Sequence, residues 1–106
     1  MQQPFIHNND ERDGLPAGGY VKGTGLYIEW QNGPLGRDAD RAEPNGAFVE
    51  TVIAAALQRI EYYNNTQFRC RENSLAITKL EEALHWLNHR TARREAEQTE
   101  GTHSGS

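Results

Sequence analysis

The sequence predicts an α+β fold, with a short N-terminal antiparallel β element followed by a long antiparallel two-helix hairpin, assembled as a homo-oligomer. The first observation is a run of aromatic and β-branched residues between turn signals. The second is a pair of apolar stripes at helical spacing, joined by a short polar connection. The third is a hydrophobic content of 36% over 106 residues, which gives one copy a small core and marginal stability alone.

The N-terminal part divides into two segments. Residues 1–18 are polar and rich in Asn, Asp, Gly and Pro, so we expect a flexible segment. Residues 19–36 form the predicted β element, with the apolar run at 26–30 and turn chemistry at 22–25 and 32–34. This pattern fits a short strand pair or one strand with an extended lead-in.

A first helix is predicted from Gly46 to about Asn64, with Asn45 as its N-cap. Its apolar positions repeat at helical spacing and form one stripe. The stripe comprises Val49, Val52, Ile53, Ala56, Leu57 and Ile60.

A second helix is predicted to begin between Arg69 and Glu72 and to run to about Ala96. Its stripe comprises Ala76, Ile77, Leu80, Ala83, Leu84 and Leu87. Because the connection is short, residues 46–96 should form an antiparallel hairpin. Residues 97–106 show no periodicity and are expected to be a flexible tail. Apolar residues off the stripes, such as Phe48, Leu75 and Trp86, favour self-association.

The composition restricts the functions to be considered. A net charge of −4 and a pI near 5.5 argue against binding to DNA or RNA polymers. The single Cys70 can form no internal disulfide, which fits a reducing compartment. The sequence has no signal peptide and no apolar run of the roughly 20 residues that a spanning helix needs. We therefore expect a soluble cytoplasmic protein without a membrane partner.

Arginines gather near the end of the second predicted helix. Arg90 and Arg94 lie one helical turn apart, with Arg93 beside them. Guanidinium groups match phosphate oxygens in bidentate geometry, so the cluster suits a phosphate-bearing ligand. On pattern alone, cations that stabilise a helix C-terminus are the better explanation.

Histidines on the same helix offer a metal site as an alternative. Glu82 and His85 resemble half of a di-iron bundle motif, and His89 follows one turn later. Solvated histidines on a helix face explain this pattern better, so we expect no metal and no cofactor. The sequence contains no nucleophile triad and no phosphate-binding glycine loop, so nothing predicts catalysis and we expect no enzyme.

The predicted hairpin tip carries aromatic and amide side chains. Tyr62 and Tyr63 end the first helix, and Asn73 follows the connection. An aromatic face stacks on a base, and an amide bonds to a base edge or a ribose. A hydrophobic patch that closes the tip is the alternative explanation.

The run from residue 70 to 91, CRENSLAITKLEEALHWLNHRT, together with QNGP at 31–34 and EGTH at 100–103, resembles the phage Thoeris anti-defence sponge family. It resembles the hairpin of anti-CBASS sponges more distantly. The resemblance implies a non-catalytic protein of the host bacterial cytoplasm that captures glycocyclic ADP-ribose-type signals and holds them intact. It also implies assembly into dimers and hexamers, and cyclic di- or trinucleotides as a second class of ligand in separate pockets.

The resemblance assigns the ligand contacts to Tyr63, Asn73, Arg90 and Arg94. Tyr63 stands where the family has Phe, which keeps the stacking face and adds a hydroxyl. Residues 97–99 depart from the family pattern Arg-Gly-Val, so the contact of that arginine is not carried over. Lys22 and Arg37 remain further candidates for phosphate contacts.

Helix geometry constrains this predicted site. Asn73 and Arg90 are about 17 positions apart, which is about 25 Å along a helix. One chain cannot bring both to one small ligand, whereas two antiparallel hairpins would form two equal sites. The competing hypothesis is a structural or adaptor hairpin that acts through self-association or protein binding. Binding to a nucleic acid is a third hypothesis, which the acidic balance disfavours.

Overall fold

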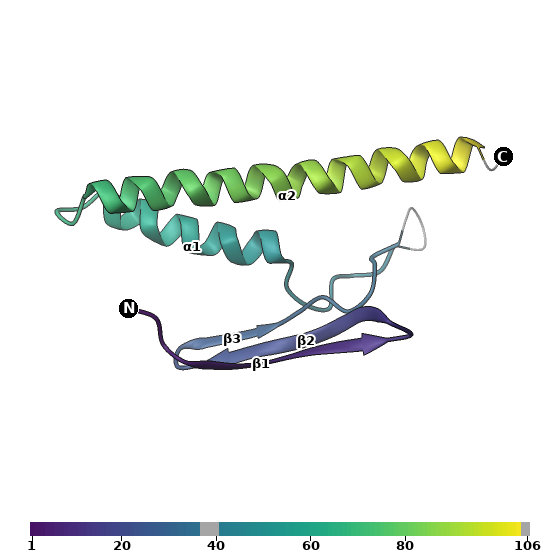
Figure 1. Ribbon diagram of the computed structural model, residues 1–106, viewed down its shortest axis with the longest axis horizontal. Coiled ribbons are helices and arrows are strands. Elements are labelled where there is room, and N and C mark those ends of the chain that lie inside the picture. Colours follow the sequence, from purple (N-terminus) through teal and green to yellow (C-terminus); the bar gives the residue numbers. More distant parts are fainter. Residues whose placement is uncertain (37–40, 105–106) are drawn as a thin grey trace. The chain divides into compact units, whose positions relative to one another are not determined.

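The computed structural model describes residues 1–36 and 41–104, with residues 97–104 described by their backbone alone. The chain forms two compact units, Met1–Val49 and Glu50–Ser106. The first contains strands β1 (Phe5–Arg12), β2 (Leu15–Gly23) and β3 (Leu26–Glu29). Helices α1 (Val49–Asn64) and α2 (Arg71–Ser104) follow (Figure 1). The predicted α+β fold, with an antiparallel β element before two helices, is confirmed.

The β element is larger than predicted, because three antiparallel strands lie in the order β1-β2-β3. Strand β1 and the start of β2 occupy residues 5–18, which were expected to be flexible. The turn Asp13-Gly14 explains the difference, because both residues have positive φ, at 55° and 78°. A two-residue turn with positive φ at both positions matches the twist of a hairpin. Asp-Gly is a strong signal for it even between polar strands.

A bulge interrupts the pairing of β1 with β2. Asn9 pairs with Gly19 and Glu11 with Pro16, so β2 holds one extra residue between these pairs. Gly19 has a φ of 130°, and a Cβ there would lie 2.0 Å from the carbonyl oxygen of Asn8. Only glycine fits this position.

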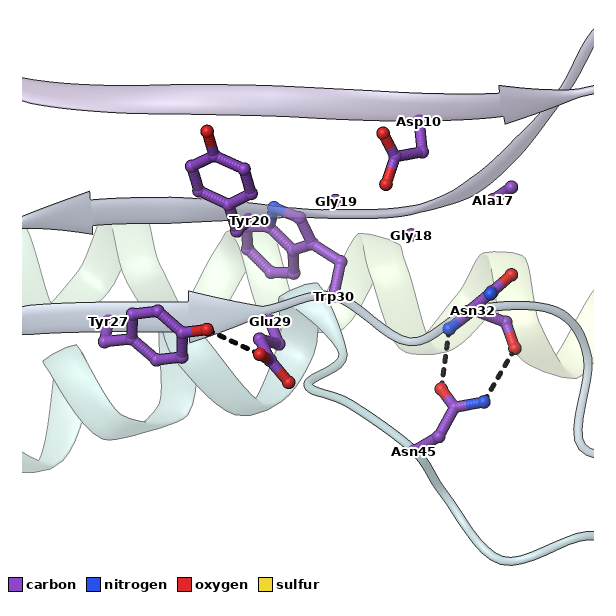
Figure 2. A pocket seen from close by; sticks show the side chains of 10 residues that line it. All are labelled: Asp10, Ala17, Gly18, Gly19, Tyr20, Tyr27, Glu29, Trp30, Asn32 and Asn45. Atoms are coloured by element: carbon purple, nitrogen blue, oxygen red, sulfur yellow. Dashed lines mark hydrogen bonds between the residues drawn. The ribbon is translucent and has the colours of Figure 1, made fainter.

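The loop before α1 is bonded to the end of β3, and this corrects the predicted role of Asn45. The Asn45 side chain accepts a hydrogen bond from the Asn32 amide at 2.7 Å and donates one to the Asn32 carbonyl at 3.0 Å (Figure 2). The Gln31 side-chain oxygen accepts from the amides of Asn45 and Gly46 at 2.9 and 3.2 Å. Asn45 is therefore not the N-cap of α1, which begins later, at Val49.

The hairpin has the predicted apolar seam, with two exceptions. Half-buried residues of α1 are Glu50, Val52, Ile53, Leu57, Ile60 and Asn64, and those of α2 are Asn73, Ala76, Ile77, Leu80, Ala83, Leu84 and Leu87. Most of these positions alternate by three and four residues, as in a coiled-coil seam. Val49 and Ala56, which were predicted on the stripe, are exposed.

Helix α2 is much longer than its neighbour. It has 34 residues against 16 in α1, and the two run side by side over the first half of α2 (Figure 1). It begins at Arg71, inside the predicted window, but its backbone stays helical to Ser104, past the predicted end at residue 96. The last residues of the predicted tail, 105–106, lie outside the described residues.

Within the described residues, one copy of the chain has no buried core. Among the residues that the structure describes, no side chain is fully buried, and large apolar side chains such as Phe68, Leu75 and Trp86 are at least half exposed. Within the same residues, no helix is long and apolar enough to cross a membrane. Burial of apolar surface is the main favourable term in folding, so a single copy gains little of it.

Candidate functional site at the two ends of the hairpin

The hairpin tip is held by hydrogen bonds centred on Asn64. Its side-chain oxygen accepts from the Cys70 amide at 3.2 Å, and its side-chain amide donates to the Ser74 hydroxyl at 3.1 Å. The Cys70 thiol accepts from the Asn73 amide at 3.4 Å, as an N-cap side chain does. These contacts fix the first turn of α2, and with it the backbone position of Asn73.

The side chain of Asn73 is half-buried at this tip. Its amide group donates to the Phe68 carbonyl at 3.3 Å. Among the residues that the structure describes, no donor meets its side-chain oxygen. This bond orients the amide and leaves an acceptor for a ligand.

Tyr63 lies at the same end of the hairpin, on the last turn of α1. Its hydroxyl accepts from Nε of Arg59 at 3.1 Å, and the Arg59 guanidinium lies 4.8 Å from the ring centroid. The rings of Tyr62 and Tyr63 are 6.0 Å apart and inclined at 50°. With 40% of its surface exposed, Tyr63 offers an aromatic face for stacking.

The arginines lie at the opposite end of the α1–α2 pairing. Arg90 is 3.8 Å from a carboxylate oxygen of Glu50, in the first turn of α1. Arg93 and Arg94 follow on the part of α2 that extends beyond α1, and both are exposed. This end of the hairpin can offer charged hydrogen bonds to an anion.

The four predicted contact residues therefore lie in two groups. Tyr63 and Asn73 are at the tip, whereas Arg90 and Arg94 are about 25 Å or more away along α2. Within one chain the structure does not bring the groups together. Lys22 lies on β2, in the other unit, and Arg37 lies outside the described residues.

His85 and His89 of α2 form an aromatic cluster with Trp86. The rings of His85 and His89 are 6.5 Å apart and nearly parallel, and Trp86 meets both edge-on. Over the described ranges, no group of three or more His, Cys, Asp or Glu side chains is placed to hold a metal ion.

A hollow of about 420 Å³ on the sheet unit was missed by the sequence analysis (Figure 2). Among the described residues, its lining includes the aromatic rings of Tyr20, Tyr27 and Trp30 and the carboxylates of Asp10 and Glu29, but no cationic side chain. The hydrogen bond from Tyr27 to the Glu29 carboxylate raises the pKa of that tyrosine above its ordinary value. The two carboxylates of this described lining are unfavourable for a phosphate, in contrast to the guanidinium groups at the arginine end of the hairpin.

Two comparisons connect this architecture to known proteins. Residues 23–92 match the family model described as the Acb2/Tad1 hairpin domain. The protein named Thoeris anti-defense 1, from Bacillus phage SBSphiJ7, is 49% identical over 76 residues. That match covers 72% of this chain and 51% of the phage protein. The chain therefore spans about half the length of that relative.

Proposed function

The chain belongs to the Acb2/Tad1 hairpin domain family, and from this premise we propose that it counters bacterial anti-phage defence by sequestering a signalling nucleotide. The ligand is a cyclic ADP-ribose-type molecule of the glycocyclic class, and it is bound without being degraded. The site of action is the cytoplasm of the infected bacterium. Cyclic di- and trinucleotides are a second ligand class to be tested.

The separation of the two residue groups along the hairpin carries this proposal. A cyclic ADP-ribose has a base, which suits the Tyr63 ring and the Asn73 amide, and two phosphates, which suit the guanidinium groups of Arg90 and Arg94. These groups lie too far apart in one chain to meet one small ligand. An antiparallel pair of hairpins brings the tip of one copy to the arginines of the other, and two-fold symmetry gives two equal sites.

The expected strength of such a site is consistent with sequestration. Nanomolar binding needs about −12 kcal/mol. Charged hydrogen bonds contribute about 1.5–3 kcal/mol each, and one base–aromatic stack adds about 1–3 kcal/mol. The remainder comes from burial and from the preorganised tip.

The exposed apolar surface supports self-association. Trp86 and Leu75 are 65% and 50% exposed on α2, and a second copy that covers them gains hydrophobic stabilisation of about 25 cal/mol per Å². We propose a dimer as the smallest binding unit, and a hexamer as an assembly of such dimers. Light scattering after size-exclusion chromatography measures the mass of the assembly and so distinguishes a dimer from a hexamer.

A subunit-mixing experiment tests the composite site. Asn73→Ala and Arg90→Ala chains are each expected to bind poorly in isothermal titration calorimetry against cyclic ADP-ribose isomers. After the two are mixed, unfolded and refolded, about half of the dimers are mixed, and each mixed dimer regains one intact site of two. The number of ligand molecules bound per chain should return to about a quarter of that of the unaltered chain, by the symmetry of the dimer.

Separate controls address the other parts of the proposal. Recovery of the ligand unchanged after heat denaturation of the complex supports sequestration, whereas a hydrolysed product contradicts it. No return of capacity on mixing contradicts a site shared between chains. The exposed apolar side chains also favour the alternative of a structural or adaptor hairpin. Under that alternative, calorimetric titration with any cyclic nucleotide gives no heat of binding, whether or not Arg90 is replaced.

A further inference from the structure

We propose that Arg59 is a positioning residue of the tip, one that holds the Tyr63 ring in its stacking orientation and places a positive charge beside the stacked base. This inference rests on the proposed function. It adds a residue that neither the sequence pattern nor the resemblance assigned to the site.

The geometry of the tip supports the positioning role. Arg59 and Tyr63 lie one helical turn apart on α1, so their side chains share a face. The Nε group donates to the Tyr63 hydroxyl at 3.1 Å. The guanidinium carbon lies 4.8 Å from the Tyr63 centroid and 5.1 Å from the Tyr62 centroid. A hydrogen bond to the hydroxyl together with a cation–π contact restrains both the χ angles and the plane of the ring.

A restrained ring binds a base more tightly than a mobile ring. An exposed tyrosine that becomes fixed on binding loses about 0.5–1.5 kcal/mol in side-chain entropy. Because Arg59 orders Tyr63 before the ligand arrives, most of this side-chain entropy is already lost in the free protein and does not oppose binding. Arg59 also covers part of the ring surface, so a base has to stack on what remains accessible, which restricts the ligand orientation.

The charge of Arg59 is available to the ligand. A guanidinium has several N–H donors, and the bond to Tyr63 uses only the Nε donor. Within the part of the chain that the structure describes, no carboxylate forms an ion pair with Arg59, whereas Arg90 has Glu50 nearby. The remaining donors are left for an anionic group of a ligand whose base stacks on Tyr63.

A double-mutant cycle tests the coupling between the two side chains. Arg59→Met keeps the length of the side chain but removes its charge and donors, and Tyr63→Phe removes only the hydroxyl. With the tightest-binding cyclic ADP-ribose isomer, Arg59→Met should weaken binding about tenfold, and Tyr63→Phe about threefold. In the Arg59→Met background, Tyr63→Phe should have no further effect.

Two readouts separate this role from a merely structural one. The melting temperature of Arg59→Met should match that of Arg12→Ala, an exposed arginine of the sheet unit, so the tenfold loss does not arise from unfolding. Raising the salt concentration from low to high should weaken binding less in Arg59→Met than in the unaltered chain, because one charge contact is missing.

The outcomes distinguish this inference from the function on which it rests. If the unaltered chain binds no cyclic ADP-ribose isomer, the proposed function is overturned and this inference with it. If the unaltered chain binds and Arg59→Met binds equally well, only the inference is overturned. The same holds if Tyr63→Phe weakens binding equally in both backgrounds.

Discussion

The two ends of the hairpin use polar side chains in opposite ways. At the tip, the side chains of Asn64 and Asn73 form hydrogen bonds to other residues of the tip, and these bonds fix a small surface. At the arginine end, α2 runs on without α1, and Arg90 has one contact to Glu50, at 3.8 Å. The polar groups of the tip are therefore fixed by hydrogen bonds within the hairpin, whereas Arg90 has a long ion pair where α1 begins.

The largest expected effect tests the arginine end. Arg90→Ala should weaken ligand binding at least about a hundredfold, because a bidentate phosphate contact contains charged hydrogen bonds of about 1.5–3 kcal/mol each. The melting temperature should scarcely change, since the side chain is half exposed. Titration calorimetry and circular dichroism measure the two quantities.

The matched control is Arg41→Ala, an exposed arginine of the sheet unit. It should leave binding unchanged. An equal loss in both variants would mean that net charge, rather than the arginine end, determines affinity.

A smaller effect, on stability, is expected at the tip. Asn64→Ala removes the hydrogen bonds to Cys70 and Ser74 and should lower the free energy of unfolding by about 1–3 kcal/mol. Asn64→Asp keeps the acceptor for the Cys70 amide and should lose less. Urea unfolding at one fixed protein concentration measures both, because self-association makes stability depend on concentration. If Asn64→Ala is as stable as the unaltered chain, the hydrogen bonds of Asn64 do not stabilise the tip, and the two ends of the hairpin do not differ in this respect.

The smallest effect concerns the ion pair. Glu50→Gln should change the free energy of unfolding by less than about 1 kcal/mol, because the pair is partly exposed and long. Binding should tighten about threefold, because the carboxylate no longer attracts Arg90 away from the phosphate. Weaker binding would instead show that Glu50 holds Arg90 in its binding position. The same calorimetric titration decides between these results.

The sequence predicted the hairpin well because its signal is periodic. The seam from Ile53 to Ile60 and from Ala76 to Leu87 repeats at helical spacing, and the connection has the expected length. The distance between Asn73 and Arg90 also followed from the helical rise. Periodicity and rise are local properties, so they require no knowledge of the tertiary fold.

The β region was harder to predict, because its strands are polar and its signal lies in a turn. Asp13-Gly14 is the turn signal for a hairpin at residues 5–23, but the prediction for this segment used its polar composition alone. The hollow on the sheet could not be predicted, because its lining residues come from all three strands and from the loop before α1, which are distant in sequence. The role of Asn45 was wrong for a similar reason, since its partner, Asn32, is distant in sequence.

The site itself came only partly from the residues. Charge alone favoured a capped helix for Arg90 and Arg94, and the resemblance made them site candidates. Arg59 escaped notice although its spacing from Tyr63 is visible in the sequence, because spacing does not show whether a guanidinium lies over a ring. Side-chain coordinates were needed for that step.

The two-residue turns of the sheet also bear on how the chain folds. Each strand pairs only with its neighbour in sequence, and the widest pairing joins Phe5 to Gly23. Hairpins of this kind close in about 1–10 μs, whereas a ribosome adds about 5–20 residues per second. The sheet can therefore form seconds before α2 is complete. Its early pairing satisfies β2 on both sides and, within the described residues, leaves only the outer edges of β1 and β3 without a partner strand.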